Sequence, residues 1–189
     1  MSLFAPPKDL ITEVFTEIPA ELRRENTESA WGRVNKFGKS VHSFLEGPSF
    51  DREGNLYVVD IPFGRIFRID PAGSWTQVAE YDGWPNGLKI HRDGRIFITD
   101  YRRGIVELNP ETGVVTEILG HVKTEGLKGV NDLVFATNGD MYFTDQGQTG
   151  LHDPTGRVYR YNLDSGKLDL LIDTVPSPNG LVLNPEETI

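Results

Sequence analysis

Four side chains that carry oxygen recur at one position of a repeated pattern in this chain of 189 residues. Glu46 opens EGPSFDREGNLYVVD, Asn86 opens NGLKIHRDGRIFITD, Asn131 opens NDLVFATNGDMYFTD, and Asn179 opens NGLVLNPEETI. The offsets between these starts are 40, 45 and 48 residues. Carboxylate and amide oxygens are the ligands that Ca²⁺ and Mg²⁺ prefer. If the fold brings the four residues to one point, they could surround a hard cation.

A plainer interpretation of the same residues is a turn. Asn followed by Gly is a common turn former, and both Asn86 and Asn179 precede a glycine. Glu46 is not a turn former of this kind, although it occupies the same register. The shared register favours a ligand role for Glu46, Asn131 and Asn179, whereas both interpretations stay open for Asn86. One carboxylate with three amides is weak by charge count, so a further acidic ligand is expected.

The elements around these residues follow one pattern. A polar turn with glycine separates the first apolar run from a second strand that alternates with period 2. The second strands are predicted at 56–59, 96–99 and 141–144, the third at 65–70, 104–109 and 157–162, and the fourth at 75–81, 114–119 and 167–173. Four short strands per 40–45 residues are typical of a β-propeller blade. We therefore predict an all-β propeller of four-stranded blades, with the first strand of each blade facing the central channel.

The repeat divides the chain. Residues 1–45 form a lead that contains a candidate closing strand, Leu10 to Ile18, and a loop or short helix over 21–40. Residues 46–189 form a partial propeller with blades at 46–84, 85–129 and 130–177 and the start of another at 178–189. Propellers usually close with about 4–8 blades. About three and a quarter blades therefore predict a truncated propeller.

The amino-acid composition excludes several kinds of functional site. The net charge of −9 argues against a nucleic-acid surface, and the absence of cysteine excludes thiolate catalysis and Cys-based zinc sites. No leader pattern or long apolar run is present, which predicts a cytoplasmic protein that does not span a membrane.

Most of the remaining polar residues, among them the histidines and the aspartates that end the second strands, are expected to have structural rather than catalytic roles. His91 is predicted in a surface turn, while His42 and His152 lie in loops that could border a site. The three aspartates that end the second strands are expected to organise turns rather than to catalyse: Asp60, Asp100 and Asp145.

From about residue 42 onward, the chain resembles the regucalcin/gluconolactonase (senescence marker protein) family. The resemblance rests on EGPSFDREGNLYVVDIPFGRIFRID, VNDLVFATNGDMYFTD and SPNGLVLNPE, in this order. It implies a six-bladed propeller that binds one divalent cation and hydrolyses a sugar lactone to the hydroxy acid. Ca²⁺ is the implied cation, with Zn²⁺, Mg²⁺ and Mn²⁺ as alternatives.

The resemblance also implies roles for individual residues. Glu46 and Asn179 match metal ligands, Asn131 matches an asparagine that contacts the substrate, and Asn86 is a further candidate for substrate binding. The aspartate expected as general base lies beyond Ile189, so no catalytic residue is assigned in the chain. Some members carry a sugar-binding Arg where this sequence has Gly129. A non-catalytic calcium- or small-ligand-binding propeller is the alternative, and a protein-interaction propeller is a third.

Overall fold

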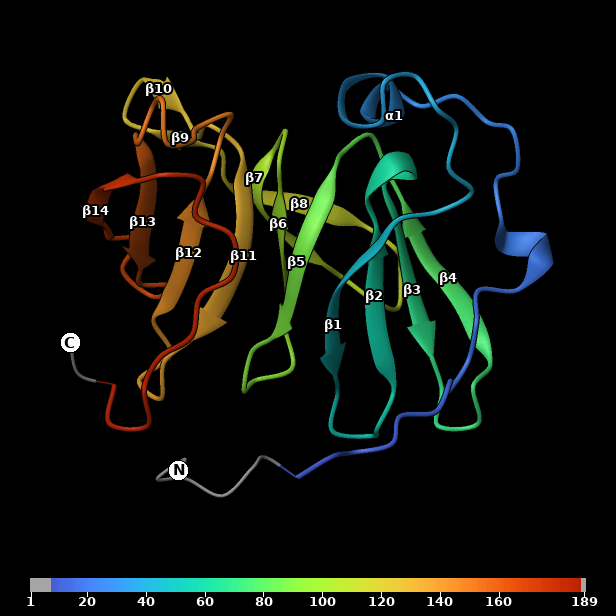
Figure 1. Ribbon diagram of the computed structural model, residues 1–189. Coiled ribbons are helices and arrows are strands. Elements are labelled where there is room, and N and C mark those ends of the chain that lie inside the picture. Colours follow the sequence, from blue (N-terminus) through green and yellow to red (C-terminus); the bar gives the residue numbers. More distant parts are fainter. Residues whose placement is uncertain (1–7, 188–189) are drawn as a thin grey trace, which may run out of the picture.

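The structure, a computed structural model, describes residues 8–187, whose longer strands form three four-stranded antiparallel sheets, called blades here (Figure 1). Blade 1 contains β1 (Leu45–Phe50), β2 (Leu56–Asp60), β3 (Arg65–Ile69) and β4 (Trp75–Glu80). Blade 2 contains β5 (Pro85–Ile90), β6 (Ile96–Asp100), β7 (Gly104–Leu108) and β8 (Val115–Leu119). Blade 3 contains β11 (Val130–Phe135), β12 (Met141–Asp145), β13 (Gly156–Tyr161) and β14 (Leu168–Val175). The predicted all-β fold with four strands per repeat is confirmed.

The turn glycines behave as the repeat predicts. Gly54, Gly94 and Gly139 have φ values of 84°, 94° and 94°, the left-handed region that glycine enters without steric cost. A further two-stranded hairpin, β9 (His121–Val122) with β10 (Glu125–Gly126), connects blades 2 and 3. The sequence pattern did not predict it because each strand has only two residues.

Alternating side chains bury both faces of blade 2. Ile96 and Ile98 in β6 pack toward blade 1, in a cluster with Tyr57, Val59 and Ile66. The residue between them, Phe97, packs toward blade 3 in a cluster with Val130, Leu133, Met141 and Phe143. Successive strand residues point to opposite faces, so the apolar runs of the repeat fill two interfaces at once. Burial between blades, rather than within one sheet, therefore forms the core.

The lead segment differs from its prediction in one respect. Residues 10–18 form no strand, and their contacts with blade 1 are made by the last few side chains, since Leu10, Ile11, Val14 and Phe15 are exposed. Ile18 packs against Val58 and Phe67, and the Thr16 hydroxyl accepts a hydrogen bond from the Trp75 indole at 3.0 Å. The short helical content expected over 21–40 is confirmed by α1 (Ala30–Asn35), which follows the 3₁₀ turn η1 (Ala20–Leu22).

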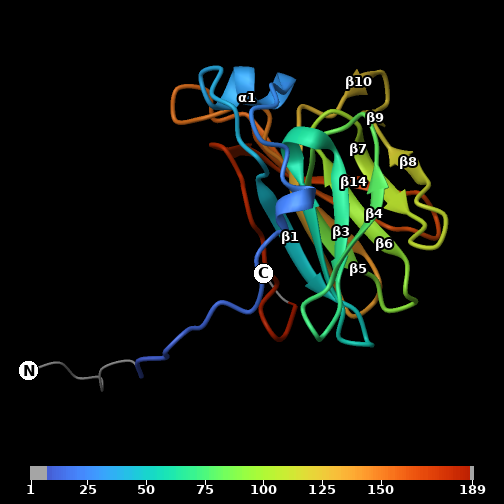
Figure 2. The same cartoon turned by 90° about the vertical axis from the view of Figure 1, so that its right-hand side faces the viewer.

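The ends of the blades differ in construction. The inner strand β5 lies between β1 and β11, and α1 lies at one end of blade 1 (Figures 1 and 2). The opposite end carries the tight hairpin turns. Residues 178–187, expected to begin another blade, form no strand and run across blade 3 (Figure 1). No helix within residues 8–187 is long and apolar enough to cross a membrane.

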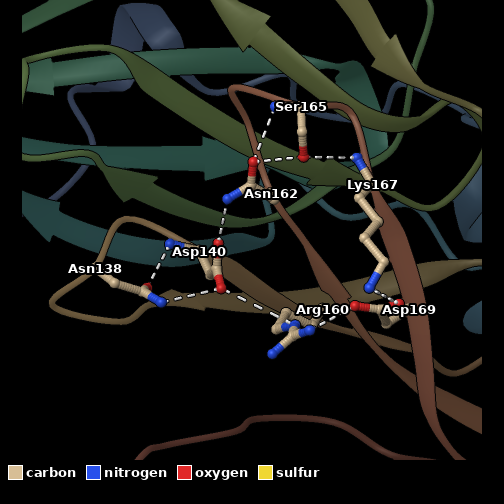
Figure 3. A network of polar contacts seen from close by, with 7 residues as sticks. All are labelled: Asn138, Asp140, Arg160, Asn162, Ser165, Lys167 and Asp169. Carbon is tan, nitrogen blue, oxygen red and sulfur yellow. Dashed lines mark hydrogen bonds and ion pairs between the residues drawn. The ribbon is translucent and has the colours of Figure 1, made fainter.

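The hairpin end of blade 3 is fixed by polar contacts (Figure 3). Asp140 is buried and accepts hydrogen bonds from Asn162 at 2.7 Å and from Asn138 at 3.1 Å. Arg160 donates to Asp169 at 2.6 Å. The Asn162–Asp140 bond connects the β13–β14 turn with the β11–β12 turn, and the Arg160–Asp169 bond joins β13 to β14.

Candidate functional site

A cavity of about 420 Å³ lies at the α1 end of the inner strands. All four residues of the repeated position line it, so the structure brings together the predicted set: Glu46, Asn86, Asn131 and Asn179. The cavity wall is completed by residues from the lead, from the loops before and after the strands, and from the segment after β14, including Trp31, Phe44, Trp84, Tyr101, Gln146 and His152.

Close approach of the inner strands brings three of the four residues to the same cavity. Glu46 lies in β1, Asn86 in β5 and Asn131 in β11. A Cβ atom on Gly47 would lie 2.7 Å from the Asn86 carbonyl oxygen, a distance that real Cβ atoms do not reach. Glycine after Glu46 therefore allows β1 and β5 to approach until their ligand-bearing residues face one cavity.

The hydrogen bonds of Asn131 orient its amide. The side chain is 6% exposed, and its Nδ2 donates to Gln146 Oε1 at 2.9 Å. Gln146 Nε2 in turn donates to Ser177 Oγ at 2.7 Å. With Nδ2 used in this way, Oδ1 of Asn131 is the atom left for a ligand.

The other three predicted residues present unused polar atoms. Within residues 8–187, the side chains of Glu46, Asn86 and Asn179 make no hydrogen bond with another part of the protein. Asn179 uses only its backbone carbonyl, which accepts from Thr144 Oγ1 at 2.7 Å. Three polar side chains that face a cavity without protein partners are available to a ligand.

The donor atoms fit a hard cation by type. Glu46 is the one carboxylate among the described residues that line the cavity, and the amides of the three asparagines add neutral oxygens. Oxygen donors suit Ca²⁺ or Mg²⁺, whereas structural zinc sites are built from Cys and His. Residues 8–187 hold no group of three or more His, Cys, Asp or Glu arranged for a metal. The four side chains therefore offer the oxygen donors that a hard cation prefers, but only one of them, Glu46, carries a negative charge.

Aromatic rings form much of the remaining wall. Trp84 and Tyr101 lie with their ring centroids 5.9 Å apart, and Trp31 and Phe44 lie 4.8 Å apart. The Tyr101 ring also fills the space beside Gly129, where a Cβ atom would lie 2.5 Å from the ring. The side chain that is missing at Gly129 is thus replaced in space by an aromatic ring.

The three aspartates at the ends of the second strands support the loops of the cavity wall. Asp60 Oδ1 accepts from the Phe44 amide at 2.7 Å, and Asp145 Oδ1 accepts from the Gly129 amide at 2.8 Å. Asp100 Oδ1 accepts from the Arg102 and Arg103 amides. Burial raises the pKa of both Asp60 and Asp145. The predicted role in organising turns is confirmed by these bonds.

The histidines separate into two groups. His152 lines the cavity, while His42 pairs with Ser43 outside its lining. The surface position predicted for His91 is wrong, because its side chain is only 8% exposed. The β5–β6 turn lies against blade 3, so the His91 ring packs on Phe135 with centroids 4.8 Å apart.

Sequence reasoning missed several residues of the wall. Trp31 comes from α1 in the lead, outside the repeat, and Gln146 comes from the loop after β12. Gln146 directly follows the aspartate that ends its strand, and that position is the one signal in the sequence that could have indicated it.

Comparison with known proteins gives consistent matches. Residues 44–189 match the family described as the SMP-30/Gluconolactonase/LRE-like region. Lactonase drp35 of Staphylococcus epidermidis is 30% identical over 171 residues, which cover 86% of this chain and 50% of that protein. Lactonase drp35 of Staphylococcus aureus is 30% identical over the same length. The chain spans about half the length of the curated relatives it matches.

Solved structures share the fold. A gluconolactonase from Xanthomonas campestris superposes with a TM-score of 0.69 at 24% identity, over 77% of this chain and 52% of the other. Regucalcin from Agrobacterium tumefaciens, described as a calcium-binding protein, superposes with a TM-score of 0.55 at 22% identity, over 69% and 43%. Together with the family match over residues 44–189, these likenesses agree with the repeated four-stranded sheets. The chain belongs to the SMP-30/gluconolactonase/LRE-like family.

Proposed function

We propose that the protein containing this chain hydrolyses a lactone to the open-chain hydroxy acid with the help of one divalent cation. The observation that carries the proposal is the convergence of one carboxylate and three amide side chains in a single cavity of about 420 Å³. The relatives named lactonase support the reaction class. The calcium-binding description of the regucalcin neighbour motivates Ca²⁺ as the cation.

Each residue has a proposed role. Glu46 and Asn179 would hold the cation, as the family resemblance implies, and both present side-chain oxygens without protein partners. Asn131 and Asn86 would contact the substrate, with Asn131 Oδ1 accepting a substrate hydroxyl because its Nδ2 is bound to Gln146. When bound, a divalent cation supplies Lewis acidity to an ester carbonyl. The proposal also includes an aspartate beyond Ile189 as the general base. It divides the chain into a lead (1–45) and a partial propeller (46–189).

The cavity lining supports a neutral, hydroxylated ring as substrate, such as a sugar lactone. Aromatic side chains offer faces for the C–H surface of a ring, and amide groups offer hydrogen bonds to its hydroxyls. Trp84 and Tyr101 provide such faces, while Gln146, Gln148 and Asn86 provide amides. Lys128, the basic residue nearest to Gly129 in the sequence, does not line the cavity, and its Nζ donates to Thr155 at 2.9 Å.

The test is a hydrolysis assay of the protein that contains this chain with gluconolactone and related sugar lactones. We expect turnover that EDTA abolishes and Ca²⁺ restores. Glu46→Gln keeps the shape and removes the charge, so it should weaken Ca²⁺ binding and lower turnover by at least about tenfold. Glu53→Gln, in the β1–β2 turn at the opposite end, is the matched control and should change neither.

The alternative, a non-catalytic propeller that binds calcium or a small ligand, predicts a different outcome. It would bind Ca²⁺ through Glu46 but hydrolyse no sugar lactone with any divalent metal. That combination would reject the enzymatic proposal and retain the cation site.

A further inference from the structure

We propose that Thr99 and Thr144 are positioning residues, each of which fixes the ligand-bearing residue of the following repeat. The inference rests on the proposed function for its consequence, but its geometry is independent of any reaction. Thr99 Oγ1 donates to the Asn131 carbonyl at 2.6 Å, and Thr144 Oγ1 donates to the Asn179 carbonyl at 2.7 Å. Both bonds cross from one repeat to the next.

Each hydroxyl also accepts a bond from its own blade. Thr99 Oγ1 accepts from the Gly87 amide at 2.8 Å, and Thr144 Oγ1 accepts from the Asp132 amide at 3.1 Å. A hydroxyl has one donor and two acceptor positions, so one oxygen can connect two inner segments. Thr99 and Thr144 are 0% and 1% exposed, and water therefore does not compete for these bonds.

Blade 1 has no threonine hydroxyl that donates to the next repeat in this way. Val59 in β2 occupies the register position of Thr99 in β6 and Thr144 in β12, the residue before the final aspartate of each strand. Valine has the shape of threonine without the hydroxyl, so it cannot donate to the next repeat. Asn86, which follows blade 1, therefore has no equivalent anchor. A threonine hydroxyl therefore anchors Asn131 and Asn179 to the preceding repeat, whereas Asn86 is held through its place in β5 without such a bond.

Asn179 depends most on its anchor. Asn131 lies in β11, where its neighbour Val130 pairs with Asp145 of β12 and Gln146 bonds to its side chain. Asn179 lies in a segment without a strand ladder, so the bond from Thr144 is the main polar contact at this residue. Loss of one buried hydroxyl should therefore move a proposed cation ligand.

The test uses ¹⁵N relaxation of the full chain with three variants. In Thr144→Val we expect the backbone order parameter of Asn179 to fall from about 0.85 to below about 0.6. Thr144→Ser keeps the hydroxyl and should stay near wild type. Val59→Thr is the reciprocal control and should reduce the mobility of Asn86.

Three results of the relaxation experiment would overturn the inference. Unchanged order at Asn179 in Thr144→Val would overturn the inference, and so would equal mobility of the Ser and Val variants, which would indicate methyl packing. If Thr144→Val does not fold, Val59→Thr decides: unchanged mobility of Asn86 would overturn the inference.

A Ca²⁺ titration then connects positioning with the proposed function. We expect Thr144→Val to bind Ca²⁺ about tenfold more weakly, the effect of one buried hydrogen bond, and Thr144→Ser to restore binding. Wild-type affinity in an ordered Thr144→Val variant would reject Thr144 as a positioning residue for the ligand. If wild type itself binds no Ca²⁺, the cation part of the proposed function fails, while the relaxation data still decide the positioning.

Discussion

Asp60 in blade 1 and Asp145 in blade 3 occupy the same position of the repeat and are both 0% exposed, yet their surroundings differ. Asp60 Oδ2 accepts two bonds from Arg65, at 2.8 and 2.6 Å, and its Oδ1 accepts from the Phe44 amide. Asp145 Oδ1 accepts from the Gly129 amide, but its Oδ2 has no hydrogen-bond partner within residues 8–187. Equal burial at equivalent positions therefore does not mean equal contribution to stability.

The difference lies in where the arginine of the third strand points. Arg65 is the ladder partner of Asp60, is 2% exposed and turns its guanidinium to that carboxylate. Arg157 is the ladder partner of Asp145, but its guanidinium bonds to Tyr159 and Glu125 instead. The direction of one arginine side chain thus separates a satisfied buried carboxylate from one with an unused oxygen.

The largest expected effect is that of Asp60→Ala. Removing the carboxylate leaves the Arg65 guanidinium buried without its anionic partner, which costs about 3–5 kcal/mol of unfolding free energy. Asp145→Ala is the matched control, because it makes the same change at the equivalent position and leaves no buried arginine behind. Urea denaturation of both variants measures the difference. Equal losses would show that the Arg65 pairing does not distinguish the two sites.

A smaller loss of unfolding free energy is expected when the hydrogen bond to Asp100, the equivalent aspartate of blade 2, is removed. Its Oδ2 accepts from the Tyr81 hydroxyl at 2.8 Å, and burial raises the pKa of that tyrosine well above its ordinary value. Tyr81→Phe removes a hydrogen bond to a charged acceptor and should lower the unfolding free energy by about 1.5–3 kcal/mol. Tyr161→Phe, whose hydroxyl makes no hydrogen bond within the described residues, should change it by less than about 0.5 kcal/mol.

The smallest effect is expected for Asp145→Asn, within about 1 kcal/mol of wild type at pH 7. Its pH dependence is the sharper test. Burial raises the pKa of Asp145 above 3.8, so the folded state binds this proton more tightly than the unfolded state does. Wild type therefore loses stability relative to Asp145→Asn as the pH rises from about 4 through the raised pKa. A difference that stays constant across this range would contradict the assigned direction.

The repeat made much of the fold predictable, because its signals are local. Period-2 alternation and the turn glycines placed the second, third and fourth strands, and the shared register placed Glu46 with the three asparagines. The burial of His91 and the supply of Trp31 to the cavity depend on contacts between distant segments. Such contacts leave no periodic trace in the sequence, and for the same reason the difference between Asp60 and Asp145 could not be predicted.

The glycines that follow Glu46 and Asn86 have a consequence for how the site can evolve. A methyl group at Gly47 would meet the neighbouring inner strand, and one at Gly87 would meet Asp132 and Thr99, each at 2.7 Å. The side chain that carries the chemistry faces the cavity, whereas a side chain at the neighbouring glycine would have to displace the atoms around it. Selection can therefore revise the chemistry of these two repeats one residue at a time, while the glycine beside it keeps the scaffold unchanged.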